Sequence, residues 1–127
     1  MERLLISNTT KQTIPKIAFE GIKNDILGKQ YELSLTFIGQ ARAQNLNLAH
    51  RNKSYTPNIL SFPLDTTVGE IFICPIIAMK EAKNFNLSVK GYVAFLFIHG
   101  CLHLKGHDHG DTMERLEARY RKKYQLT

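Results

Sequence analysis

The segment from Ser88 to Gly106 constrains the fold of this chain more than any other stretch of its sequence. Ser88 suits the N-cap of a helix and Gly106 suits its C-terminal end, so one helix is predicted between them. That helix is apolar on nearly every side, which is typical of a helix surrounded by other elements. Its apolar residues are Val89, Tyr92, Val93, Phe95, Leu96, Ile98 and Leu102. We therefore expect a central, buried helix.

The remainder of the chain alternates short strands with helices. Strands are predicted at residues 3–7, 31–37, 59–62 and 69–74, and Pro63 is expected to stop the third of them. Helices are predicted from residues 13–15 to Gly28, over 39–49, over 75–84, and from a capping box of Asp111 and Glu114 onward. This pattern predicts an α+β (mixed α/β) fold, a small mixed sheet of about four strands packed by helices.

Length and composition favour one domain over residues 1–127 that needs no disulfides, because 43% of the residues are hydrophobic. The two cysteines, Cys74 and Cys101, fit neither a CxxC motif nor a disulfide scaffold, so we expect both to be buried thiols in a reducing compartment. The N-terminus lacks the pattern of a secretory signal, and the apolar run 92–104 is too short to cross a bilayer. A cytoplasmic protein without a membrane partner is the expectation.

The formal net charge of +6 favours a polyanionic partner such as RNA, DNA or an acidic membrane surface. A mildly basic protein with no such partner is the alternative, and composition does not separate the two. The basic residues near the C-terminus are typical of a solvated helix end. They are Arg119, Arg121, Lys122 and Lys123.

The motif HGCLHLKGHDH contains a candidate metal site. His99 and His103 are four residues apart, so on a helix both imidazoles lie on one face and can meet one ion. Gly106 allows the chain to turn and present His109 as a third ligand. Three imidazoles leave one tetrahedral position of a Zn²⁺ ion for water, as in catalytic sites, although Ni²⁺, cobalt or copper also suit such ligands. Ordinary buried histidines are the alternative interpretation for any single one of them.

The same spacing occurs in the metzincin peptidases, whose motif is HExxHxxGxxH. In that motif the residue after the first histidine is a glutamate that acts as general base, but here it is Gly100. Glycine cannot accept a proton from water, which makes a peptidase a weak alternative.

Two blocks of the sequence resemble the YbeY family of bacterial metal-dependent endoribonucleases. HGCLHLKGHDH resembles that family's HGxLHLxGyDH, and LNLAHRNKSYTPNILSFP resembles its LNxxyRxxxxxTdvLSFP, within residues 46–111. The strand GEIFIC is also similar to the family's G-D-I-x-I. The resemblance implies that His99, His103 and His109 are the metal ligands and that Arg51 faces the site. The chain departs from the pattern at His107, Glu70 and Pro57.

The chemistry of the side chains in these two blocks suggests a role for each of several residues. Arg51 would bind a phosphate bidentately and, with His103, carry catalysis, although an exposed loop arginine is the alternative. Asn58 and Ser61 would bind substrate or serve as turn and strand residues, and Asp108 would orient an imidazole or cap the turn. His50 is expected to be exposed.

The leading hypothesis is a single-strand-specific, zinc-dependent endoribonuclease in ribosomal RNA maturation and ribosome quality control. Metal-activated water would attack the phosphodiester, and the partners would be RNA and the ribosome. The alternatives are a metzincin-like metallopeptidase and a non-catalytic ribosome assembly factor with a structural metal.

Overall fold

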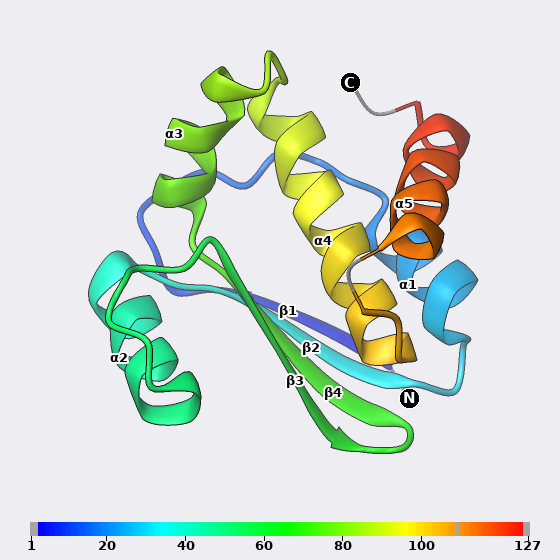
Figure 1. The fold of residues 1–127 in the computed structure, drawn as a ribbon, viewed down its shortest axis with the longest axis horizontal. Helices are drawn as coiled ribbons and strands as arrows, with labels where there is room; N and C mark the ends of the chain where they lie inside the picture. The colour runs from blue at the N-terminus through cyan, green and yellow to red at the C-terminus, as the bar shows by residue number, and fades with distance from the viewer. Residues whose placement is uncertain (1–2, 109, 126–127) are drawn as a thin grey trace.

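The computed structural model describes residues 3–108 and 110–125 and shows an α+β fold (Figure 1). Its elements, in chain order, are β1 (Leu4–Asn8), α1 (Phe19–Leu27), β2 (Glu32–Phe37), α2 (Gln40–Arg51), β3 (Ile59–Asp65), β4 (Val68–Ile73), α3 (Pro75–Asn84), α4 (Val89–Lys105) and α5 (Asp111–Lys123). The predicted fold class, with four strands and packed helices, is confirmed.

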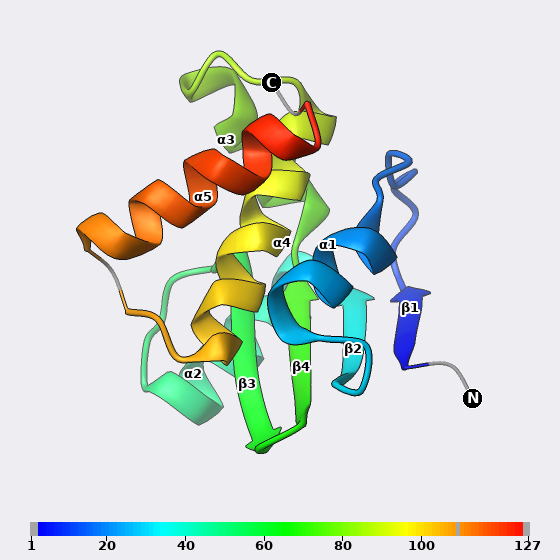
Figure 2. The same ribbon diagram turned by 90° about the vertical axis from the view of Figure 1, so that its right-hand side faces the viewer.

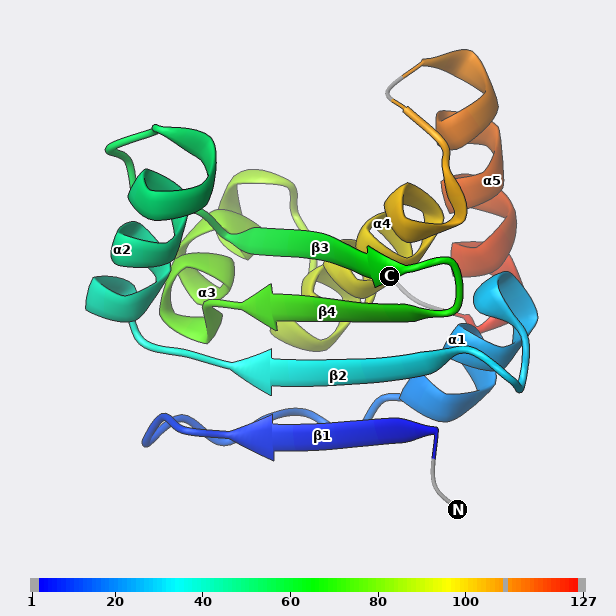
Figure 3. The same ribbon diagram turned by 90° about the horizontal axis from the view of Figure 1, so that it is seen from below.

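The sheet is mixed, with strand order β1-β2-β4-β3 (Figure 3). Strands β1, β2 and β4 run parallel, and β3 returns antiparallel to β4 after a tight turn. The alternating pattern of β2 places Leu33, Leu35 and Phe37 on a buried face, with Leu35 paired to Ile71 of β4. This face of the sheet supports the main hydrophobic core.

The predicted central helix is α4, which packs against β3, β4, α1, α3 and α5 (Figures 1 and 2). The Ser88 hydroxyl accepts a hydrogen bond from the Gly91 backbone N–H at 2.9 Å, as expected for an N-cap. Cys101 lies within this core and is fully buried. A second, smaller cluster on the opposite face of the sheet packs α2 against β3 and β4 through Ala43, Leu60 and Phe72. The two layers hold α2 and the end of α4 in fixed positions.

Three expected boundaries are wrong. The first helix begins at Phe19 rather than at residues 13–15, because Ile14 and Ile17 reach the core from irregular chain. β3 continues through Pro63 to Asp65, since β3 is an edge strand and its outer side needs no ladder donor there. Asp111 is the first residue of α5 rather than its cap, which is Gly110.

Within the described residues, no single helix has the length and apolarity needed to cross a membrane. Helices α3 and α4 taken together are long and apolar enough, but the pair is bent by 109° at the break between them.

Candidate functional site

The C-terminal half of α4 borders a cavity of about 310 Å³ that contains most of the predicted site residues. His99 and His103 lie one helical turn apart on the face of α4 that lines it. Arg51 from α2, Ser61 from β3 and Asp108 line the same cavity. Four residues that the sequence analysis singled out for catalysis, substrate or metal are therefore together, although they come from three different elements.

The end of α4 explains how Asp108 reaches this cavity. Gly106 has a φ of 110°, and its N–H donates to the His103 carbonyl at 3.0 Å. The N–H of His107 donates to the Leu102 carbonyl at 3.1 Å, which completes a Schellman motif. The motif reverses the chain directly after the second histidine, as the sequence predicted from Gly106.

The third predicted ligand, His109, lies outside the described residues. Within residues 3–108 and 110–125, no group of three or more His, Cys, Asp or Glu side chains is arranged to hold a metal ion. The metal site therefore stays a prediction, for which the structure provides two histidines on one face.

Arg51 is the last residue of α2 and not a loop residue, because Asn52 adopts the left-handed conformation that ends the helix, with φ 56°. Its Nη1 donates to Asn47 Oδ1 at 3.0 Å and to Tyr55 Oη at 3.1 Å. Asn47 is fully buried, and its Nδ2 donates to the Tyr55 carbonyl at 3.0 Å. These bonds orient the guanidinium group, and both bonds to Arg51 use Nη1.

Asn58 does not line the cavity of the histidines and Arg51. Its Nδ2 donates to Glu81 Oε1 at 2.8 Å and to Tyr92 Oη at 3.4 Å, while the Tyr92 hydroxyl donates to the same carboxylate at 2.8 Å. Burial, together with the bond to Glu81, raises the pKa of Tyr92 to about 12. Asn58 thus belongs to a polar cluster that joins the start of β3 to α3 and α4.

Glu117 of α5 is a site residue that the sequence analysis missed. Its Oε2 lies 3.1 Å from His99 Nδ1, and its side chain is only 10% exposed. A carboxylate that accepts from Nδ1–H fixes the ring, so that Nε2 carries the lone pair a metal ligand needs. The sequence contains one signal that could have identified it: Glu117 lies one turn after Met113, on the buried face of an amphipathic helix.

The donor chemistry fits a zinc-type ion. Two imidazoles four residues apart on one helix, one of them backed by a carboxylate, are the ligand type that Zn²⁺ and similar ions prefer. Cys101 is not part of this set, since burial raises the pKa of its thiol and keeps it protonated.

Gly100 lies where α4 packs tightly against the sheet. A Cβ atom there would lie 2.9 Å from Ile59 Cδ1 and 3.0 Å from Ser61 Oγ. The position of the metzincin glutamate therefore faces the sheet and has no room for a carboxylate side chain.

Two other histidines have different surroundings. The His50 ring lies 5.1 Å from the Phe62 ring, centroid to centroid, and does not line the cavity. His107 is part of the turn after α4 through its backbone N–H. Neither side chain lines the cavity with Arg51.

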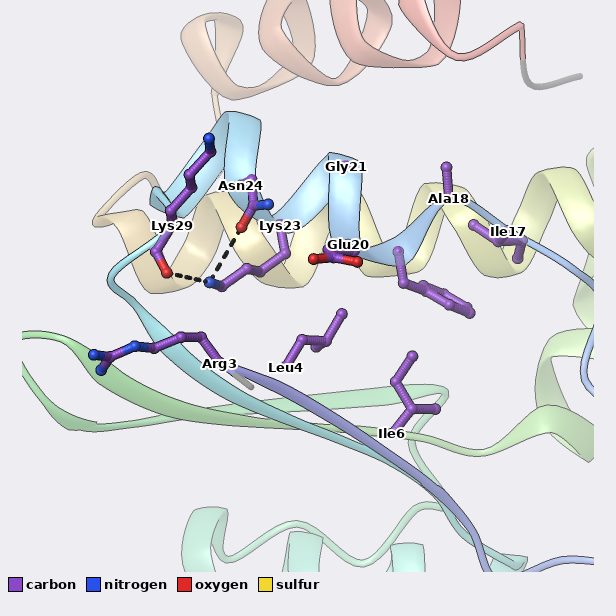
Figure 4. A pocket seen from close by; sticks show the side chains of 11 residues that line it. Arg3, Leu4, Ile6, Ile17, Ala18, Glu20, Gly21, Lys23, Asn24 and Lys29 are labelled. Atoms are coloured by element: carbon purple, nitrogen blue, oxygen red, sulfur yellow. Dashed lines mark hydrogen bonds between the residues drawn. The ribbon is translucent and has the colours of Figure 1, made fainter. Parts of the chain in front are cut away.

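A larger hollow of about 810 Å³ lies between α1 and β1 (Figure 4). Lys23 is buried there, and its ammonium donates to Asn24 Oδ1 and to the Lys29 carbonyl. Desolvation by burial lowers the pKa of Lys23, and the nearby positive charge of Arg3 lowers it further. Among the predicted site residues that the structure describes, none lines this hollow.

Comparison with known proteins agrees with the motifs. The profile of the family "Endoribonuclease YbeY" matches residues 2–127. An Endoribonuclease YbeY from Alkaliphilus metalliredigens is 33% identical over 100% of this chain and 86% of the relative, and one from Finegoldia magna is 36% identical over 76% and 67%. The solution structure of TM1509 from Thermotoga maritima shares the fold, with a TM-score of 0.66 and 23% identity over 95% of this chain and 88% of that one. This chain therefore belongs to the endoribonuclease YbeY family.

Proposed function

We propose that this chain is a metal-dependent endoribonuclease that hydrolyses single-stranded RNA and acts in ribosomal RNA maturation and ribosome quality control. The family and the net charge of +6 support an RNA substrate. The observation on which the proposal rests is the cavity in which Arg51 faces His99 and His103, from helices that are far apart in the sequence.

His99, His103 and His109 are the proposed ligands of one divalent ion, Zn²⁺ in the first place and Ni²⁺ or another transition metal as an alternative. When bound, such an ion supplies Lewis acidity and makes water nucleophilic at neutral pH. Glu117 keeps the His99 ring in one orientation by accepting from Nδ1–H. His103, in the last turn of α4, is the second ligand.

Arg51 binds the scissile phosphate in this proposal. Its Nη1 is engaged by Asn47 and Tyr55, so Nη2 and Nε are the donors for a phosphate oxygen. A fixed guanidinium group stabilises the negative charge that grows as the phosphodiester is cleaved. Ser61 contacts substrate from the sheet side of the cavity. Asn58 does so from the adjoining hollow through Oδ1, since Nδ2 is bonded to Glu81.

The proposed partner is ribosomal RNA, free or in the ribosome, and the proposed location is the cytoplasm. Two buried free thiols, Cys74 and Cys101, are consistent with a reducing compartment.

A cleavage assay on a single-stranded ribosomal RNA fragment tests the activity. The zinc-loaded protein should cut the fragment, EDTA should abolish cleavage, and added Zn²⁺ should restore it. His103→Ala should lose activity, whereas His50→Ala should keep it, because His50 lies outside the cavity. Equal cleavage by wild type and His103→Ala would remove the metal from the mechanism.

Arg51→Met should lower kcat by roughly 10²- to 10³-fold, the usual loss when one donor to a developing negative charge is removed. Zinc affinity should stay at the wild-type value, because Arg51 is not a ligand. Arg42→Met is the matched control on α2, since Arg42 packs on the Phe72 ring instead. Unchanged kcat in Arg51→Met would contradict the role of Arg51.

Digestion of casein in parallel separates this function from that of a peptidase, which the lack of space at Gly100 disfavours.

A further inference from the structure

The cavity that Arg51 and the histidines line has neighbouring hollows along α4. A second hollow of about 530 Å³ shares Ile59 and His99 with it. A third, of about 180 Å³, shares Tyr92, Phe95 and Arg121 with the second. The three hollows together follow α4 back from the site, with α5 on one side, and we name the second and third the α4 groove.

One wall of the α4 groove is a series of aromatic rings. The rings of Phe85 and Tyr92 are stacked, with centroids 5.5 Å apart and planes within 14°. The centroids of Tyr92 and Phe95 are 6.2 Å apart, and those of Phe95 and His99 are 6.4 Å apart. Phe85, at the far end, is 62% exposed. A row of neighbouring rings therefore leads away from the proposed metal ligand, with Tyr92 buried and Phe95 half-buried within it.

Arg121 of α5 lies over this wall. Its guanidinium carbon is 5.4 Å from the centroid of Phe95. Its Nε is buried and has no hydrogen-bond partner within the described part of the chain. A buried N–H donor without an acceptor is costly, and a ligand atom in the groove would satisfy it.

The charges in the groove select what can occupy it. Glu114 and Glu117 line the larger hollow of the groove, which disfavours a phosphate there, whereas Arg51 lines the neighbouring cavity of the histidines and favours a phosphate in that cavity. Aromatic rings beside an arginine are the surfaces on which bases of single-stranded nucleic acids stack. The volume of the larger hollow also lies in the roughly 300–1,000 Å³ range of small-ligand sites.

We propose that the α4 groove binds a nucleobase of single-stranded RNA next to the scissile phosphate, against Phe95 and Arg121. This inference rests on the proposed function for its substrate, and it adds where the strand leaves the site. Base pairing would remove the base from the groove, so the groove also accounts for a preference for single strands.

The test is an abasic scan of a short single-stranded RNA with one mapped cleavage site. Each nucleotide near that site is replaced in turn by an abasic one, and kcat/KM of the zinc-loaded wild type is measured. We expect a loss of about 5- to 150-fold at one or two positions on one side of the cut, the range for one base–aromatic stack. No dependence on any base would overturn the inference while leaving the proposed function intact.

Variants then locate the effect in the groove. Phe95→Leu and Arg121→Met should cleave the intact RNA less well and should lose little more at the sensitive abasic position. Arg119→Met, which removes the same charge from an exposed position of α5, should behave as wild type. Arg121→Lys keeps the charge without the planar group and should resemble Arg121→Met, which covers the case that the methionine variant folds poorly. If the abasic substitution lowered kcat/KM of each variant as much as it lowers that of wild type, the assignment to the groove would be overturned.

The experiment distinguishes failure of the proposed function from failure of this inference. If the wild type cleaves no RNA, the proposed function fails. The same abasic scan is then read as binding, by fluorescence anisotropy of the labelled RNA. Base-dependent binding that Arg121→Met abolishes would support the groove, and binding that ignores the bases, or no binding, would refute it.

Discussion

Glu117 connects the last helix of the chain to the histidines. It is nearly buried and lies 3.1 Å from His99 Nδ1, an arrangement that holds one imidazole ring in a fixed orientation. The spacing of the histidines could be predicted from the sequence because both lie on one helix. Glu117 could not, because its contact depends on how α5 packs against α4.

Glu117→Gln should weaken zinc binding by about 10- to 100-fold, because an amide polarises the imidazole less than a carboxylate does. Isothermal titration of the protein with Zn²⁺ measures this directly. Glu20→Gln is the matched control, since Glu20 lies on α1, away from the histidines. Equal zinc affinities of Glu117→Gln and wild type would contradict the positioning role of Glu117.

Helix α4 is the element that the sequence predicted best, with its cap at Ser88 and its end at Gly106 both confirmed. Its all-round apolar pattern allows only a central position. The sequence predicts that α2 ends at residue 49, before Arg51, because helix ends depend on the conformation of one residue, here Asn52. Pro63 predicts a strand end that the structure does not have, because the sequence does not say which strand lies at the edge of the sheet.

Gly100→Ala should destabilise the protein by about 1–3 kcal/mol, because the added methyl group meets Ile59, Ile71 and Ser61 at the α4–sheet contact. Urea denaturation gives the free energy of unfolding. In Gly21→Ala the added Cβ meets only the Tyr124 side chain, so the loss should stay within about 0.5 kcal/mol. A Gly100→Ala variant as stable as wild type would show that α4 does not approach the sheet this closely.

Helix α5 contacts α1 as well as α4, so the first and last helices of the chain are joined in the folded protein. Asp25 of α1 accepts hydrogen bonds from Lys123 Nζ at 2.6 Å and from the Tyr124 hydroxyl. The hydrogen bond from Lys123 lowers the pKa of Asp25 below its ordinary value of 3.8, and the bond from Tyr124 adds a smaller lowering. This contact fixes the C-terminal end of the helix that carries Glu117 and Arg121.

The lowered pKa of Asp25 means that its contribution to stability is present above the unfolded-state pKa and is lost as the pH falls through the folded-state pKa. Asp25→Asn should therefore lower the melting temperature at neutral pH, and the difference from wild type should shrink below about pH 4. Thermal unfolding followed by circular dichroism over this pH range measures it. A difference that does not depend on pH would contradict the ionic origin of the contact.

We propose above that His99, His103 and His109 bind one metal ion and leave one coordination position for solvent. X-ray absorption of the zinc-loaded protein tests it most directly. We predict three imidazole nitrogens and one further light atom at about 2.0–2.1 Å, and no sulfur. A shell closed by four side chains, or a zinc ion bound by fewer than three histidines, would contradict the account.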